Sequence, residues 1–203
     1  MPTSALLSFL LLCITITPPT RATGGLSAGE RSKLVDYLKY SRQLLESETA
    51  KLTPQQWTHK PAADRWSVAD CVEHLALAEE VIRGVVDRAL KAPAVEPADA
   101  QTVTERDQLI LRLATDRGQK FNAPERLRPA GLTPAEAMKK FLDSRAVTVE
   151  FARTTQEDLR GHAADHPLFK NADVYQWLLL AASHVERHVN QIRELKADPS
   201  FPK

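Results

Sequence analysis

Apolar residues recur every three or four positions along four stretches of this chain, which is the spacing of side chains on one face of an α-helix. The pattern predicts helices over about residues 27–50, 67–90, 134–156 and 172–197. No stretch alternates apolar and polar residues over the length of a strand. The chain is therefore predicted to be all-α, and an antiparallel four-helix bundle is the simplest way to bury four apolar stripes.

Residue types at the predicted helix starts support these limits. Ser27 and Ser67 each precede an acidic residue by three positions, the pattern of a capping box, and Thr133 stands directly before a proline. Residues 91–100 have the composition of a linker, and a short charged helix is expected over about 104–119. The third long helix is therefore expected to begin only after a long connection.

The first 22 residues have the features of a signal peptide. Residues 5–16 form an uncharged apolar run that is too short to cross a bilayer, and a small residue, Ala22, ends the following segment. No Lys or Arg precedes the run, so an uncleaved anchor or a misassigned start is the alternative. We expect cleavage after Ala22 and export of one domain, residues 23–203, to the periplasm or the cell exterior, without a membrane-spanning segment.

Composition and charge exclude several classes of function. The 203 residues carry 27 Lys and Arg against 26 Asp and Glu, a formal net charge of +1. This balance argues against nucleic-acid binding and against a polybasic membrane-surface protein, because both need a basic face. Two cysteines cannot form a disulfide framework, and the chain has no glycine-rich loop that would hold a nucleotide. At this length a hydrophobic core can stabilise the domain, so any bound metal would serve function.

One position of the last apolar stripe is occupied by a histidine, His188. His184 lies one helical turn earlier, so both imidazoles lie on the same face. Neutral imidazole is a common ligand of zinc, and nickel is the other metal we expect here. One buried and one surface histidine is the alternative. His74 flanks the stripe of the second long helix, and three histidines would bind a divalent cation with coordination positions left open.

Residues beside these histidines allow two interpretations. Asp70 and Gln191 could orient an imidazole by accepting a hydrogen bond, but a helix cap and an exposed polar position are their more ordinary roles. Glu73 adjoins His74 in sequence and is expected to point elsewhere, toward solvent or a salt bridge. Cys71 is expected to be a small buried residue.

The segments Val72-Glu73-His74-Leu75-Ala76 and His184-Val185-Glu186-Arg187-His188 carry a resemblance to a known family. Together with pattern-level features over about residues 28–197, they make the chain similar to the DinB-like superfamily of metal-binding four-helix bundles. The resemblance implies that His74, His184 and His188 bind a divalent metal, typically zinc or nickel, with solvent completing the coordination. It also implies relatives that include thiol-dependent S-transferases and a maleylpyruvate isomerase.

Two other features could belong to a site. His162 and His166 have the same spacing, but Gly161 and Pro167 enclose them and disfavour a helix. A loop or pocket-rim role is expected, and a pocket-lining role or a second metal site is the alternative. Arg145 interrupts the stripe of the third long helix, and we expect its side chain to extend outward, although its head could instead hold an anionic substrate.

Two classes of function follow from these residues. In the first, a metal-dependent enzyme uses the cation to activate water for hydrolysis or a thiol for S-transfer. In the second, the protein is a non-catalytic exported metal-binding or scaffold bundle. No further carboxylate or histidine is placed as a general base, and export disfavours S-transfer because low-molecular-weight thiols are chiefly cytosolic. The expected partner is a small-molecule substrate of unassigned type, and a homodimer through helix faces is compatible with such a bundle.

Overall fold

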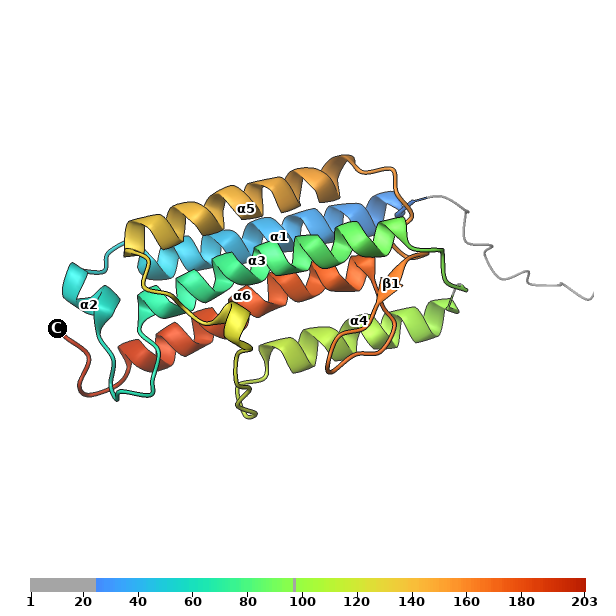
Figure 1. Cartoon of the computed structure of the whole chain (residues 1–203). Coiled ribbons are helices and arrows are strands. Elements are labelled where there is room, and N and C mark those ends of the chain that lie inside the picture. The colour runs from blue at the N-terminus through green and yellow to red at the C-terminus, as the bar shows by residue number, and fades with distance from the viewer. Residues whose placement is uncertain (1–24, 97) are drawn as a thin grey trace, which may run out of the picture.

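A computed structural model describes residues 25–203 apart from residue 97, and it confirms the predicted four-helix bundle (Figure 1). The bundle helices are α1 (Ala28–Thr49), α3 (Val68–Lys91), α5 (Pro134–Thr154) and α6 (Val174–Lys196). The expected signal peptide, residues 1–22, lies outside the described residues. Among the helices that are described, none combines the length and the hydropathy that crossing a membrane requires.

Shorter elements occupy the connections between the bundle helices. They are α2 (Pro54–Thr58), α4 (Ala100–Thr115), the 3-10 turn η1 (Glu125–Leu127) and the antiparallel strands β1 (Ala163–Ala164) and β2 (Ala172–Asp173). The charged helix α4 begins at the end of the predicted linker rather than near residue 104. It begins there because the side chain of Asp99 accepts the backbone N–H of Thr102 at 2.9 Å and caps the helix.

Each bundle helix begins with a reciprocal capping box. The N-cap side chain accepts the N–H of the third helical residue, whose own side chain accepts the N-cap N–H. The four N-caps are Ser27, Ser67, Thr133 and Asp173. Because these local hydrogen bonds set where the helices begin, they also set how far along each axis a given side chain lies.

The bundle helices do not alternate in direction around the bundle. Neighbours α1 and α6 run the same way, as do α3 and α5, whereas α1 opposes α5 and α3 opposes α6 (Figure 1). Arg31 of α1 donates to the carbonyl oxygen of Ala152, near the end of α5, at 2.7 Å. Glu48 and Arg193, near the ends of α1 and α6, form an ion pair at 2.7 Å.

The long connection of residues 92–133 explains this arrangement. It contains α4, which packs along the outside of α6 and returns the chain to the end of the bundle at which α3 began (Figure 1). Helix α5 can therefore run parallel to α3. The antiparallel contact of α3 with α6 places the first turns of α3 beside the second half of α6, the two stretches that carry the predicted ligands.

The prediction that the Arg145 side chain extends outward is wrong, because this side chain is fully buried within the bundle. Its guanidinium forms an ion pair with Glu79 of α3, which is also buried. It donates further to the carbonyl oxygens of Leu38 and Ala181 and to the hydroxyl of Ser41. A buried charge is tolerated here since a carboxylate and three oxygen acceptors satisfy its donors.

Candidate metal centre

Three imidazole rings from two helices meet at one point. The Nε2 atom of His184 lies 3.2 Å from Nε2 of His74 and 3.0 Å from Nε2 of His188. One ligand atom of each ring lies within 4.8 Å of those of the other two. In the part of the chain that the structure describes, no other group of three His, Cys, Asp or Glu side chains is close enough to hold a metal ion. The structure thus brings together the three histidines that the sequence singled out.

Hydrogen bonds on the far side of two rings determine which nitrogen faces the centre. His74 Nδ1 donates to the carbonyl oxygen of Leu127 at 2.7 Å, so a neutral ring carries its proton on Nδ1. His188 Nδ1 lies 3.0 Å from Oε1 of Gln191. Arg117, which can only donate, lies 3.4 Å from the same oxygen and so fixes the orientation of the amide. Both rings therefore present an unprotonated Nε2 to the centre.

The charge state of the rings also suits a metal ligand. Burial lowers the pKa of His74, and it lowers the pKa of His184 and His188 further, with the positive charges of neighbouring imidazoles and of Arg187 acting in the same direction. Neutral imidazole is the form that binds metal ions. Two unprotonated Nε2 atoms beside a ring nitrogen of the third imidazole form a donor set that fits a divalent ion with three nitrogen ligands and open positions.

An indole ring forms one wall of the centre. The ring centroid of Trp66 lies 4.8 Å from that of His74 and 5.9 Å from that of His188, and the second pair is stacked. His74 and His188 are buried, whereas His184 is half-buried. The apolar wall and the burial lower the local dielectric, which strengthens electrostatic interactions at the centre.

The segment of residues 116–132, which we call the strap, crosses from α4 to α5 beside the three histidines. Its backbone N–H groups at Ala130, Gly131 and Leu132 donate to the carboxylate of Glu73 at 2.7, 3.1 and 3.0 Å. The expectation that Glu73 points toward solvent or a salt bridge is wrong: its carboxylate is buried because three N–H donors satisfy it. Glu73 thereby attaches the strap to α3.

Two arginines lie where the strap meets α6. Arg117 of the strap forms an ion pair with Glu194 at 2.8 Å. Arg187 is 7% exposed, its Nη2 donates to the carbonyl oxygen of Gln119 at 2.6 Å, and its Cζ lies 5.3 Å from the ring centroid of Phe121. Burial and the charge of Arg117 lower the pKa of Arg187. Sequence analysis missed both arginines, because no spacing rule links them to the histidines.

The sequence left the residues around the histidines open, and the structure assigns them. Asp70 is the capping partner of α3, and the carbonyl of Leu127, rather than Asp70, orients His74. Gln191 is half-buried and its Oε1 lies 3.0 Å from Nδ1 of His188, so it takes the orienting role in addition to its more ordinary place at the polar rim. Cys71 is buried as expected, burial raises the pKa of its thiol to about 12, and it is not part of the three-histidine group.

The second histidine pair lies in the loop before α6. His162 Nδ1 lies 3.0 Å from the carbonyl oxygen of Ala92, and the His166 ring packs against Phe169 and Trp177 with centroids 5.1 and 5.3 Å apart. Both contacts agree with the expected loop role. Neither residue belongs to a group that could hold a metal ion among the described residues, so nothing supports a second metal site.

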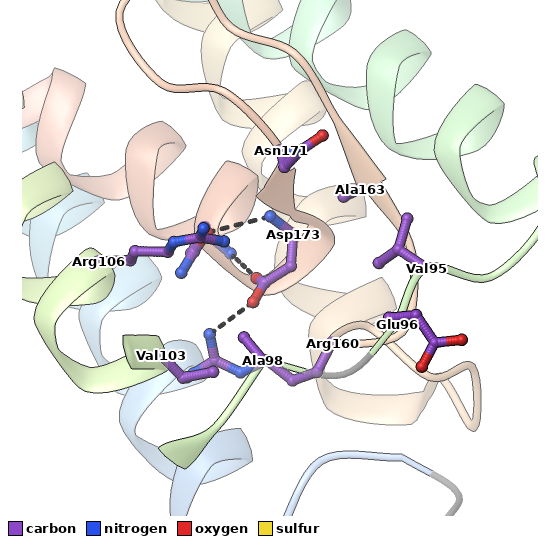
Figure 2. A pocket seen from close by; sticks show the side chains of 10 residues that line it. Val95, Glu96, Ala98, Val103, Arg106, Arg160, Ala163, Asn171 and Asp173 are labelled. Carbon is purple, nitrogen blue, oxygen red and sulfur yellow. Dashed lines mark hydrogen bonds and ion pairs between the residues drawn. The ribbon is translucent and has the colours of Figure 1, made fainter. Parts of the chain in front are cut away.

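A separate hollow of about 290 Å³ lies at the other end of α6, lined in part by Val95, Arg106, Arg160 and Asp173 (Figure 2). Arg160 donates to Asp173 at 3.0 Å and also pairs with Asp107 and Glu30. Its charge is therefore already matched by carboxylates of the protein. This network joins the loop before α6 to α1 and α4 and has a structural explanation without a ligand.

Comparisons with known proteins agree with the fold. Residues 37–192 match the model of the DinB superfamily. Over 153 residues the chain is 27% identical to an uncharacterised Bacillus subtilis (strain 168) protein named YuaE, which covers 74% of this chain and 89% of YuaE. The structure of YfiT from Bacillus subtilis superposes with a TM-score of 0.57 at 18% identity, over 85% of this chain and 89% of YfiT. YfiT is described as a probable metal-dependent hydrolase with an unusual four-helix bundle topology.

Proposed function

The chain belongs to the DinB superfamily, and from this premise we propose that it is a metal-dependent hydrolase whose divalent cation is bound by His74, His184 and His188. The observation that carries the proposal is the convergence of three Nε2 atoms from two helices, with the protons of two rings held on the opposite nitrogen. The description of YfiT, which shares the fold, supports the reaction class.

The chain's own residues would bind the cation, orient its histidine ligands and shield them from solvent. Leu127 and Gln191 hold the imidazoles of His74 and His188 in the ligand tautomer. When bound by three imidazoles, zinc lowers the pKa of a water ligand to about 7 and polarises a carbonyl oxygen. Trp66 covers one side of the rings, and the carbonyl oxygen of Leu127 in the strap contacts His74, so the rings are partly shielded from bulk water, which strengthens electrostatic interactions with a bound substrate.

A non-catalytic metal-binding protein is the second candidate. It is favoured by one observation: within the described residues, the group of side chains close enough to share a metal ion consists of the three histidines, without a carboxylate.

Metal analysis of the purified chain tests the ligand assignment. We expect close to one equivalent of zinc or nickel in the wild type and a loss of most of it in His184→Ala. His59→Ala is the matched control, since this histidine lies away from the centre, 3.2 Å from the hydroxyl of Ser200. Equal metal in the wild type and His184→Ala would refute the assignment.

Turnover separates the two candidates. The metal-loaded wild type is assayed against a panel of esters and amides, with thiol acceptors included to detect S-transfer. Hydrolysis that disappears in His184→Ala and persists in His59→Ala supports the hydrolase. Stoichiometric metal without turnover on any member of the panel supports the non-catalytic binder.

A further inference from the structure

Arg187 has a donor that the folded chain does not satisfy. In residues 25–203 apart from residue 97, only two buried side-chain nitrogen or oxygen atoms have no hydrogen-bond partner, Nη1 of Arg187 and Nε of Arg83. Arg187 is 7% exposed, so water does not readily replace the missing partner. An unsatisfied buried donor on a charged group is costly and calls for an explanation.

No carboxylate of the described chain pairs with this guanidinium. Ion pairs within 4.0 Å are formed by the neighbouring arginines, Arg117 with Glu194 and Arg193 with Glu48, but by none of the described acidic groups with Arg187. Among the described residues, its hydrogen-bond partner is the carbonyl oxygen of Gln119, to which Nη2 donates at 2.6 Å. The positive charge of Arg187 is thus buried and not neutralised by a direct partner.

The position of Arg187 connects this charge with the three-histidine centre. It directly precedes His188 and lies three residues after His184, one helical turn along α6. Its charge is close enough to act on the pKa of both imidazoles. A divalent cation on three neutral imidazoles would add two further positive charges beside it, so the region would attract an anion strongly.

We propose that Arg187 binds the carboxylate of a small-molecule substrate next to the metal centre. The inference rests on the proposed function and deepens it by naming the class of substrate as carboxylates. Nη1 supplies the hydrogen bond and the charge, and the group to be hydrolysed then lies toward the three histidines. The strap carries Gln119 and Phe121 against the guanidinium, so substrate binding involves a local displacement of this segment.

A carboxylate suits this donor better than a phosphate does. Nη1 is the buried donor of this guanidinium that has no partner, whereas Nη2 donates to the carbonyl oxygen of Gln119. One guanidinium charge matches the single charge of a carboxylate. A phosphate group would bring a second negative charge, which the single charge of this guanidinium does not match.

The test is a titration of the zinc-loaded full chain with sodium propionate at constant ionic strength, followed by the backbone amide resonances of residues 117–121. We expect saturable shifts confined to the strap and the neighbouring part of α6, with no such shifts on addition of neutral propionamide. Arg187→Gln should weaken propionate binding about tenfold or more, the effect of losing a hydrogen bond to a charged group. Arg193→Gln, an exposed arginine of the same helix, should bind as the wild type does.

Three readouts keep this inference separable from the proposed function. Zinc content is measured in every variant, and we expect Arg187→Gln to retain its zinc. A wild type without zinc would refute the metal proposal but not the role of Arg187. The same titration on the zinc-free wild type then still tests Arg187, with weaker but saturable shifts expected on the strap. Unchanged propionate affinity in Arg187→Gln, or wild-type shifts away from the strap, would overturn the inference. Tighter binding of inorganic phosphate than of propionate would overturn the carboxylate assignment.

If Arg187→Gln does not fold, Arg187→Lys takes its place, because it retains the charge but not the planar guanidinium. We expect Arg187→Lys to bind propionate more weakly than the wild type does but still measurably, and to prefer propionate over propionamide as the wild type does. Loss of that preference in a folded, zinc-loaded Arg187→Lys would contradict a charge-based role.

Discussion

At the scale of single residues, the groups that orient the histidines decide whether the centre can bind a metal. A histidine near an apolar stripe is compatible with many roles, but Nδ1 of His74 and of His188 each have an acceptor that leaves Nε2 unprotonated. One acceptor is a backbone carbonyl in the strap, and the other is Gln191 on the same helix as the ring that it orients. Only the second can be removed by a point substitution.

Gln191→Ala is therefore expected to lower metal affinity about 10- to 100-fold, since His188 loses the acceptor that fixes its tautomer and ring orientation. Competition with a chromogenic chelator measures the affinity. Asn190→Ala is the control, because this neighbour contacts Arg193 rather than a ligand ring. Equal affinities of Gln191→Ala and the wild type would show that the hydrogen bond has no part in metal binding.

At the scale of elements, buried carboxylates attach segments that are distant in sequence. Glu73 joins α3 to the strap through three backbone N–H groups, and Glu79 joins α3 to α5 through Arg145 and Thr148. Both residues lie on α3, the helix that carries His74. The elements around the three histidines are thus held by polar contacts in addition to apolar packing.

Replacing Glu73 by Gln should loosen the strap. An amide offers one acceptor oxygen, and its NH2 group would face backbone N–H donors, so we expect a loss of about 1–3 kcal/mol in the free energy of unfolding. Hydrogen exchange at the amides of residues 130–132 should become faster. Glu80→Gln is the control, since Glu80 pairs with Lys140 near the surface. Unchanged exchange in Glu73→Gln would mean that the strap is held by other contacts.

Removing Glu79 should be much more costly than removing an exposed acid. Glu79→Ala leaves the fully buried Arg145 without its ion-pair partner, and we expect a loss of about 3–5 kcal/mol in the free energy of unfolding by chemical denaturation. Asp143→Ala, which breaks an exposed pair with Lys139, should be indistinguishable from the wild type. The double substitution Glu79→Leu, Arg145→Met should be less destabilised than Glu79→Ala, because it leaves no unpaired buried charge.

At the scale of the whole molecule, burying three histidines makes stability depend on pH. Burial keeps the folded-state pKa of His74, His184 and His188 below the ordinary value of 6.5, whereas in the unfolded chain they titrate normally. Below about pH 6.5 the unfolded chain therefore binds more protons than the folded one, and acidification favours unfolding. Metal binding to the folded state would oppose this trend.

For the metal-free wild type we expect the free energy of unfolding to fall as the pH is lowered from 7 to 5. Each buried imidazole contributes a slope approaching about 1.4 kcal/mol per pH unit. Burial raises the pKa of Asp173 to about 6, which acts in the opposite sense below that pH, so the diagnostic quantity is the difference from His184→Ala. That variant should show a shallower fall, measured by denaturation at each pH. Parallel curves for the two proteins would contradict the assigned burial effect.

The sequence by itself determined the helices and the residues that they present. Apolar spacing and capping residues are local signals, and they gave the four long helices within a few residues and identified His74, His184 and His188 as candidate ligands. Local hydrogen bonds and helical periodicity act between residues up to four apart, so they can be recognised without a fold.

Only the tertiary structure decided what surrounds those residues. Contacts between distant residues bury Arg145 and Glu73, orient His74 through a carbonyl of the strap and hold the guanidinium of Arg187. The residues in these contacts lie 36 to 68 positions apart in the sequence. Such contacts follow from the path of residues 92–133, which returns the chain along α6 before α5 begins. Desolvation and hydrogen bonding across that path set the charge and orientation of each group, and no periodicity in the chain encodes them.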